Sequence, residues 1–512
     1  MSIDNSLTNR RIAKNSILLS FRMVFVLLIG LYTTRAVLSL LGVEDYGVYN
    51  VVCGFVSMFA FLNTSMINGI QRFFNFEYGK NGEEGANKVF NTALLIQICL
   101  VIIILILTES VGVWYLHNKM VIPEGRMIAA EWIFHFSILS FVFVILQVPY
   151  GAAIMAHEQM DYYALVNIVD AVLKLAIVLI IPYLKGNYLI IYGILWSLIS
   201  LFDFLMYMIY ARKKFSEIRI NAFFCKKTFT SMLGFSIWNL FGSLSGVMKE
   251  QGINIVMNLF FGPVVNAARG IAAQVNGGVQ GFASNIMISV RPQVVQSYAK
   301  GDIVRTMSLT FSISKLSCYV LYIIALPVII EIDYILNFWL GANIPNHTST
   351  FILIVLFTSF VGNLNSAISN VVHASGIMRL YQIVGGVIGL LSVPVAYGAL
   401  KLGGSPESAM WVAFASMTVT QINAIWILKT IVNYSIRNYI YQVLIPIFSV
   451  IITTAFIPLI PYYLMETGFI RLCVVGVISV LSVITSIYLF GLNISEKEIV
   501  VQMVKKKLKK KR

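Results

Sequence analysis

The chain has 512 residues, a mean hydropathy of +0.83 and a net charge of +15; 58% of its residues are hydrophobic and 12% are charged. A soluble chain would carry about twice this charged fraction, so the composition excludes an ordinary soluble protein. It predicts an all-α polytopic membrane protein, in which the surplus of Lys and Arg reports on membrane topology and not on nucleic acid.

Apolar runs long enough to cross a bilayer, which takes about 20 residues, recur along the whole chain and predict about 14 transmembrane helices. We expect an N-terminal six-helix lobe at 1–213, a C-terminal six-helix lobe at 214–435, two extra transmembrane helices at 436–495 and a basic cytoplasmic tail at 496–512. The predicted spans are 15–41, 46–73, 89–116, 128–149, 160–184, 188–211, 229–261, 264–290, 308–330, 349–372, 378–400, 409–432, 438–462 and 469–491.

Lys and Arg concentrate on one side of these spans. Of the 37 residues, 27 lie on the side of the N-terminus, five lie in the opposite loops and five lie within spans. Because positive residues mark the cytoplasmic side, both termini are expected in the cytoplasm. The first apolar run is expected to be a retained span and not a signal peptide, since Arg35 interrupts it and no small-residue cleavage site follows.

Short matches repeat along the chain at a nearly constant offset. The matching segments are Leu40-Leu41-Gly42-Val43 with Phe260-Phe261-Gly262-Pro263 (offset 220), Tyr78-Gly79-Lys80 with Tyr298-Ala299-Lys300 (220), and Ala156, Met160, Tyr163 with Ala374, Met378, Tyr381 (218). Two halves in the same orientation predict two lobes related by an axis along the membrane normal, with substrate bound between them near mid-membrane.

Five cations lie within the predicted spans: Arg22, Arg35, Lys174, Lys249 and Arg269. A charge at the centre of a span costs about 2.5–3.5 kcal/mol, so it needs a function or a partner. These cations lie at several depths, which would serve an anionic group that moves across the membrane. Arg binds phosphate through its fork of donors and Lys binds it as a point charge.

Structural explanations remain open for several of these charges. Lys249 and its neighbour Glu250 could neutralise each other inside the bundle. Arg35 could extend outward to Glu44 or Asp45. Asp170 and Lys174 are spaced i,i+4 and could form a self-neutralised pair.

Two further acids are candidates for a coupling-ion site. These are Asp203 in the sixth span and Glu131 at the start of the fourth, although Asp203 could instead pair with the basic cluster at Arg212. Glu250, Asp170 and Lys174 are candidates for coupling or structural roles in the same way.

Motifs of soluble enzymes are missing from the sequence. It has no Walker A motif, no HExxH and no GxSxG, and its five cysteines show no metal-binding or disulfide spacing. We therefore predict a transporter and not an enzyme, with no catalytic residues, no metal site and no cofactor.

Two segments before predicted spans carry a family resemblance: Leu41-Gly42-Val43-Glu44-Asp45-Tyr46-Gly47-Val48-Tyr49 and Phe261-Gly262-Pro263-Val264-Val265-Asn266-Ala267-Ala268-Arg269-Gly270. With the arrangement of six, six and two spans, they make the whole chain resemble polysaccharide flippases of the Wzx type, in the multidrug/oligosaccharidyl-lipid/polysaccharide exporter superfamily. The loops Ala156–Tyr163 and Ala374–Tyr381 also look typical of this family.

The resemblance implies a function in cell-envelope polysaccharide biosynthesis, such as that of O-antigen, lipopolysaccharide or capsule. It implies that undecaprenyl-diphosphate-linked oligosaccharide moves from the inner to the outer leaflet of the bacterial cytoplasmic membrane by alternating access through a cationic cavity. Related lipid II flippases carry basic residues in the first and seventh spans, and Arg22 and Lys249 occupy the corresponding spans here. The implied partners are the lipid-linked oligosaccharide, the phospholipid bilayer and the polysaccharide polymerase.

Two alternatives remain open at this point. An ion-coupled multidrug exporter of the same superfamily needs a carboxylate site, which Asp170 and Asp203 could provide. The first span, however, contains two arginines and no acid, which favours an anionic substrate. An uncoupled lipid scramblase would also fit, and its transport would ignore the membrane potential.

Overall fold

The structure of the protein is a computed structural model. It describes residues 2–157, 159–221, 226–341, 343–375, 378–432, 434–494 and 496–498. Within these ranges it does not describe the side chains of 2–24, of 60–65, of most of 226–242, or of scattered positions at 68–80 and 285–299, together with 160 and 378.

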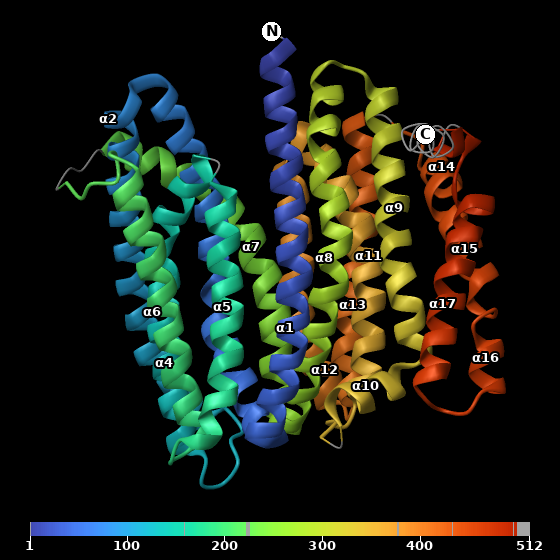
Figure 1. The fold of residues 1–512 in the computed structure, drawn as a ribbon, viewed down its shortest axis with the longest axis horizontal. Coiled ribbons are helices and arrows are strands. Elements are labelled where there is room, and N and C mark those ends of the chain that lie inside the picture. The colour runs from blue at the N-terminus through green and yellow to red at the C-terminus, as the bar shows by residue number, and fades with distance from the viewer. Residues whose placement is uncertain are drawn as a thin grey trace. The chain divides into compact units, whose positions relative to one another are not determined.

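All regular elements in the described residues are helices (Figure 1). This confirms the predicted all-α fold class. The α-helices are α1 Ser2–Ser57, α2 Phe61–Leu107, α3 Val113–Asn118, α4 Met127–Ala156, α5 Met160–Ile180, α6 Tyr188–Lys214, α7 Lys226–Phe261, α8 Pro263–Ala299, α9 Ile303–Ile330, α10 Ile332–Leu340, α11 Thr348–Ser375, α12 Met378–Lys401, α13 Pro406–Val432, α14 Ile436–Tyr439, α15 Ile445–Ala455, α16 Leu459–Leu464 and α17 Phe469–Ser486. Short 3-10 or π segments join some of them, at Met58–Ala60, Thr108–Gly112, Ile181–Tyr183, Ile440–Leu444 and Ile487–Gly491.

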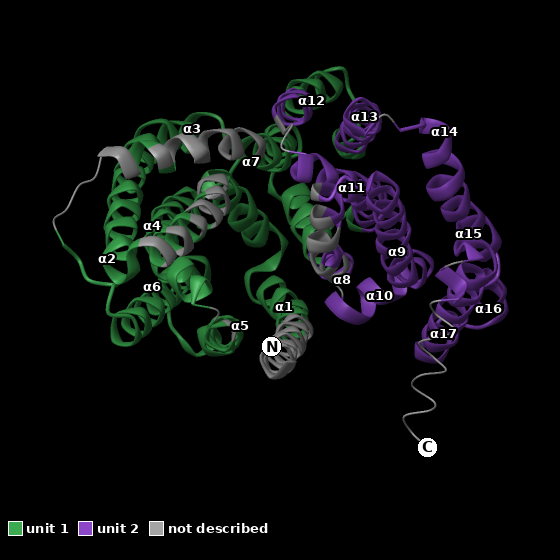
Figure 2. Cartoon of the chain, turned by 90° about the horizontal axis from the view of Figure 1, so that it is seen from above, with its two compact units in different colours: residues 1–274, 343–348, 389–412 green, residues 275–342, 349–388, 413–512 purple. Residues whose placement is uncertain are grey.

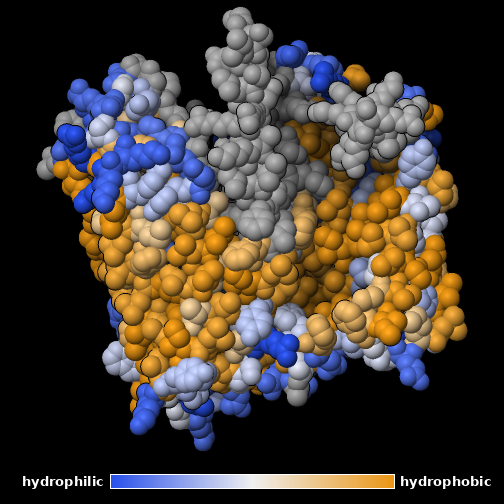
Figure 3. All heavy atoms as spheres, in the orientation of Figure 1, coloured by the Kyte–Doolittle hydropathy of each residue, from blue (hydrophilic) through white to orange (hydrophobic). Residues whose placement is uncertain are grey.

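Eleven helices of the described residues are long and apolar enough to cross a membrane. This number is roughly consistent with the predicted 14, because α7, α8 and the start of α2 include side chains that are not described. Figure 3 shows apolar side chains in a broad band over the part of unit 1 that α5 and α6 occupy in Figure 1, with hydrophilic side chains gathered at both ends of the band. A hydrophobic belt between polar ends is what a bilayer requires of a multi-pass protein.

Two glycines break the helices at matching places in the repeat. Gly42 interrupts α1 with φ of 77°, and Gly262 separates α7 from α8 with φ of 73°. Only glycine adopts this left-handed region without strain, so both breaks follow directly from the sequence. Gly82, inside α2, has φ of 61° and divides that helix in the same way.

Contacts between Cα atoms divide the chain into two compact units (Figure 2). Unit 1 comprises residues 1–274, 343–348 and 389–412, and unit 2 comprises 275–342, 349–388 and 413–512. These bounds differ from the predicted lobes at 1–213 and 214–435, and the two-lobe division stays a prediction.

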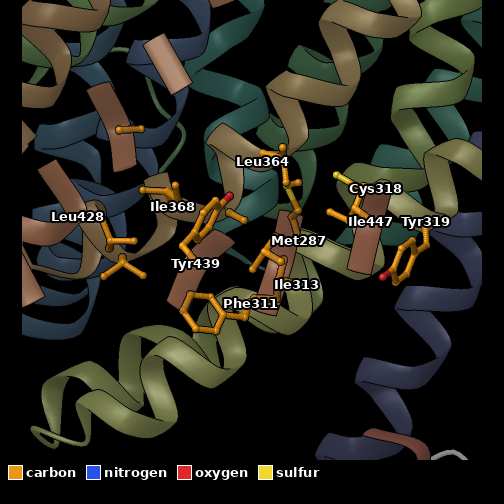
Figure 4. Close-up of a cluster of buried hydrophobic side chains, with 14 of the residues drawn as sticks. Met287, Phe311, Ile313, Cys318, Tyr319, Leu364, Ile368, Leu428, Tyr439 and Ile447 are labelled. Atoms are coloured by element: carbon orange, nitrogen blue, oxygen red, sulfur yellow. The ribbon is translucent and has the colours of Figure 1, made fainter. Parts of the chain in front are cut away.

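Each unit has its own hydrophobic core. The core of unit 1 packs α2, α4 and α6 around Phe74, Phe90 and Tyr207. The core of unit 2 gathers side chains of α8, α9, α11 and α13 with those of the last helices, and Figure 4 shows Met287, Phe311 and Tyr439 in it. The last helices are thus part of the interior of unit 2.

Two buried ion pairs also join α9 of unit 2 to the end of the chain. At one end of α9, Arg471 donates to both oxygens of Glu331 at 2.7 Å. Near the middle of α9, Lys315 lies 2.6 Å from Glu496. Glu331 is 1% exposed and Arg471 is 9% exposed, so this pair excludes water and acts as a bidentate clamp.

Candidate functional site

Two cavities in unit 1 hold charged side chains in otherwise mostly apolar walls, and we call them the polar cavities. The first, which we call the carboxylate cavity, has a volume of about 610 Å³ and is walled by α2, α4, α5 and α6. The second, the α1 cavity, measures about 430 Å³ and is walled by α1, α5, α6 and the start of α8. Asp170, Lys174 and Trp196 line both cavities, so they form the partition between them.

The charges at this partition come from α5 and α6. The Lys174 ammonium donates to Asp170 at 2.9 Å and lies 4.5 Å from the centre of the Trp196 ring. The i,i+4 pair predicted from the sequence is therefore formed, because residues one helical turn apart share a face.

Asp203 reaches the same place from α6. Its carboxyl group interacts with that of Asp170, and its Oδ1 is buried without a hydrogen-bond partner among the described residues. When both carboxyl groups are ionised, Asp170, Asp203 and Lys174 together carry one net negative charge. A bound proton or cation would neutralise this charge. Asp203 lines the carboxylate cavity. The pairing with the basic cluster near Arg212, which the sequence left open, is therefore not formed in the part of the chain that the structure describes.

A second group of charges lies between α7 and α8. Lys249 and Glu250 are in α7 and Arg269 is in α8, and the three side chains interact electrostatically. Arg269 donates to the main-chain oxygen of Glu250 at 2.5 Å and to the sulfur of Met410 at 3.3 Å. Its hydrogen-bond acceptors are neutral, and the Glu250 carboxylate acts on both cations, so the three side chains together carry one net positive charge.

Lys249 forms no hydrogen bond or ion pair with any residue that the structure describes. It does not pair with Glu250, whose side chain is exposed, although the sequence left that pairing open. Lys249 is twelve residues before the end of α7, about 18 Å along the helix, and Arg269 is six residues into α8, about 9 Å. The main chains of the two residues therefore lie at different distances from the break at Gly262, but the Arg269 guanidinium reaches the carbonyl of the residue next to Lys249.

Buried amides hold α7 to α8 at their corner, and α1 packs closely on this corner. Asn266 donates to both the main-chain and the side-chain oxygen of Asn254 at 2.8 Å, and Asn258 donates to Asn266 at 3.1 Å. Gly47 of α1 lies so close to Pro263 that a Cβ atom there would overlap the Pro263 carbonyl. The two segments that carried the family resemblance are thus in direct contact.

Arg35 lies apart from the two polar cavities. It lines a separate cavity with Tyr32 and Ser39, on a different face of α1 from Thr33 and Thr34 of the α1 cavity. Asp45, which the sequence offered as its partner, instead lies 3.1 Å from Arg126.

Arg22 and Glu131 are the remaining charged candidates from the sequence. The side chain of Arg22 lies outside the described residues. Glu131 pairs with His117 at 2.8 Å and lines neither polar cavity. Among the described residues, no three His, Cys, Asp or Glu side chains converge into a metal site.

Neutral polar residues of these cavities were missed in the sequence. Gln147, Asn167 and Ser200 line the carboxylate cavity, and Asn50 and Gln274 line the α1 cavity. The signal was available for Asn167, which precedes Asp170 and Lys174 by one and two helical turns and so shares their face. The other residues are isolated polar positions in apolar helices, and nothing in their spacing distinguishes them.

Solved transporter structures share this fold. An inward-closed structure of the lipid II flippase MurJ matches with a TM-score of 0.65 and 17% identity, covering 93% of this chain and 98% of that one. An inward-facing MATE-family multidrug resistance transporter of the MOP superfamily matches with a TM-score of 0.60 and 12% identity, covering 82% and 94%. A MOP-superfamily transporter from Pyrococcus furiosus, reported to have a binding pocket of reversed polarity, matches with a TM-score of 0.54 and 13% identity, covering 82% and 96%.

The chain therefore has the fold of MOP-superfamily transporters, as its resemblance to that superfamily implied. Neither a family model nor a curated protein matches the sequence. Identities of this size show the fold alone, so the narrower polysaccharide-exporting branch stays a prediction.

Proposed function

We propose that this protein is a flippase that moves a diphosphate-linked oligosaccharide lipid, of the undecaprenyl type, from the inner to the outer leaflet of the bacterial cytoplasmic membrane. Two lobes of six helices would alternate between inward-open and outward-open states around a cationic site. O-antigen, capsule and exopolysaccharide repeat units are the substrates that fit this proposal, with the polysaccharide polymerase as a downstream partner.

The observation that carries the proposal is the excess positive charge between α7 and α8. Lys249 has no ion-pair partner among the described residues, and Arg269 is held only by neutral acceptors there. A diphosphate cannot enter a low-dielectric region unless its charge is paired. Lys249 and Arg269 would both pair with it, and we assign Arg22 to the same path from its place in the first span.

Arg35 is the weaker member of the proposed set. It lines its own cavity with Tyr32 and Ser39 and not the α1 cavity, so it would meet the diphosphate only at a later stage of the path. We therefore expect Arg35→Ala to reduce transport less than loss of Lys249.

The carboxylates at the cavity partition support an ion-coupled return step. Asp170 and Asp203 share Lys174, so the group gains or loses one positive charge when a proton or cation binds and leaves. Moving one charge across the membrane potential supplies about 2.3 kcal/mol per 100 mV. Such a site would reset the transporter without ATP.

The same carboxylates favour one rival, an ion-coupled exporter of cationic drugs. The MATE-family structures with this fold are described as multidrug resistance transporters. A cationic drug would be repelled by Lys249 and Arg269 but attracted by Asp170 and Asp203. Drug resistance of a sensitive host that expresses the protein separates the two functions.

The direct test is leaflet-resolved detection of lipid-linked oligosaccharide in cells with and without the protein. If depletion traps the oligosaccharide lipid in the inner leaflet, the proposal stands. If the lipid reaches the outer leaflet unaided while the protein still confers resistance to cationic drugs, the exporter replaces it.

A further inference from the structure

An apolar groove lies on the surface of unit 1 between α5 and α6, which run side by side (Figures 1 and 2). Its volume is about 560 Å³. The wall on α6 consists of residues spaced at helical intervals, which places them on one face. These are Phe202, Leu205, Met206, Ile209 and Lys213.

Ring stacking and hydrogen bonds order the end of the groove near Lys213. The rings of Tyr162 and Tyr210 stack at 3.6 Å, and the Tyr162 hydroxyl donates to the Met206 carbonyl at 2.9 Å. The Lys214 ammonium donates to Gln159 at 2.6 Å and to the Tyr210 hydroxyl at 2.9 Å. These contacts fix α5 to α6 and hold Lys214 in place.

Lys213, in contrast, is exposed and forms no hydrogen bond or ion pair with a residue that the structure describes. The apolar wall on α6 is also exposed, since Phe202 is 43% and Ile209 is 48% exposed. The groove thus combines an apolar channel with two cations at one end, which complements a molecule with an acyl chain and a negative headgroup.

The length of the groove matches one leaflet of a bilayer. Phe202 and Lys213 are eleven residues apart, about 16 Å along α6. Half of a hydrocarbon core of about 30 Å is about 15 Å. An acyl chain that starts at Lys213 would therefore end near Phe202, at the middle of the membrane.

We propose that this groove binds one anionic phospholipid from the leaflet at the Lys213 end of α6, which the distribution of Lys and Arg predicts to be the cytoplasmic leaflet. One acyl chain lies along α6 against Phe202 and Ile209, and the phosphate is bound by Lys213 and Lys214. The site is distinct from the cavities assigned to transport and does not depend on the transported substrate.

The test is lipid retention by the full chain, purified from bilayers that contain equal amounts of dioleoylphosphatidylglycerol and dioleoylphosphatidylethanolamine and analysed by native mass spectrometry. The wild type should retain phosphatidylglycerol in preference. Lys213→Gln should weaken this retention about fivefold, the effect of one basic residue near a membrane surface. Ile209→Trp fills the groove without a change in charge and should displace the lipid.

Arg219→Gln is the matched control, because Arg219 is an exposed cation in the segment after α6 that does not line the groove. It should leave retention unchanged. Equal retention of the two phospholipids by the wild type, or equal losses in Lys213→Gln and Arg219→Gln, would overturn the proposal. Retention of added undecaprenyl phosphate in place of phosphatidylglycerol would also overturn it.

Discussion

Lys249 is the residue on which the proposed function depends most. It is half-buried in α7, and the charges that act on it are Glu250 and Arg269. A cation in this position is costly unless a ligand pairs with it for part of the transport cycle.

Lys249→Ala should therefore reduce surface polysaccharide at least about tenfold at an unchanged protein level, since one charged hydrogen bond is worth roughly 1.5 kcal/mol or more. Lys249→Arg should retain part of the activity because the charge remains. Lys401→Ala, at the exposed end of α12, is the matched control and should be silent. Normal polymer in Lys249→Ala would remove this residue from the substrate path.

The Arg471–Glu331 pair makes a prediction about stability. Arg471 also lies 4.5 Å from the ring centre of Tyr462, and both charged groups are buried. Removing one partner of a buried pair leaves the other charge uncompensated, at a cost on the order of 3 kcal/mol.

Arg471→Met should thus lower the thermal unfolding midpoint of the purified protein, and so should Glu331→Gln. The double variant should be more stable than the sum of the two single losses implies, because no unpaired charge remains. Additive losses would mean that the two side chains do not act as a pair.

Single residues also show which contacts could be predicted from the sequence and which could not. The pairing of Asp170 with Lys174 followed from their i,i+4 spacing. The pairing of Glu331 with Arg471 did not, because 140 positions separate them and their loops contain no matching pattern. Contacts between distant helices depend on packing, which the spacing of charges does not encode.

At the scale of elements, the α7–α8 corner packs against α1 through close backbone contact. Gly47→Ala would place a methyl group on the Pro263 carbonyl and force α1 away from the corner. Overpacking of this kind costs typically 1–3 kcal/mol. We expect a lower unfolding midpoint for Gly47→Ala, measured on the purified protein.

Gly398→Ala provides the comparison for Gly47→Ala. It introduces the same methyl group into α12, where no atom lies within 4 Å of the added Cβ. Its midpoint should equal or exceed that of the wild type. Equal midpoints for the two variants would contradict the close contact at Gly47.

The end of the chain gives a prediction about pH. Burial raises the pKa of Glu496, but hydrogen bonds from Lys315 and Ser312 outweigh burial and hold this pKa below its ordinary value of 4.5. A carboxyl group whose pKa is lower in the folded state stabilises the fold above its unfolded pKa and loses this effect as the pH falls through the folded value.

Glu496→Gln should therefore lower the unfolding midpoint at pH 7, and the difference from the wild type should shrink as the pH falls below about 4.5. Glu498→Gln, two residues further on and exposed, should show no such difference at either pH. A difference for Glu496→Gln that stays constant with pH would exclude the ion pair as its source.

Element boundaries were partly predictable. The breaks at Gly42 and Gly262 followed from the repeated Gly in an apolar context, and both positions have positive φ. The helix α10 and the short helix α16 were not predicted, because each is shorter than a membrane span and lies inside or beside an apolar run. A hydropathy pattern identifies spans, and it does not resolve what connects them.

At the scale of the molecule, composition predicted the class of protein, since 58% hydrophobic residues with only 12% charged ones are typical of a membrane protein. The fold of MOP-superfamily transporters was implied by the family resemblance of its spans and of the segments 41–49 and 261–270. The substrate did not, because the same fold is found in a lipid II flippase and in multidrug transporters. The charges at Lys249 and Arg269 are what favour an anionic substrate.

The most direct measurement is the transbilayer movement of a prenyl-diphosphate-linked oligosaccharide by the purified protein in liposomes, with an added glycosidase that reports the sugars exposed outside. We expect the wild-type protein to expose the oligosaccharide on the outside of the liposomes. Lys249→Gln should not expose it, and Lys401→Gln should behave like the wild type. Equal exposure with Lys249→Gln, or no exposure by a protein that instead moves a cationic dye, would contradict it.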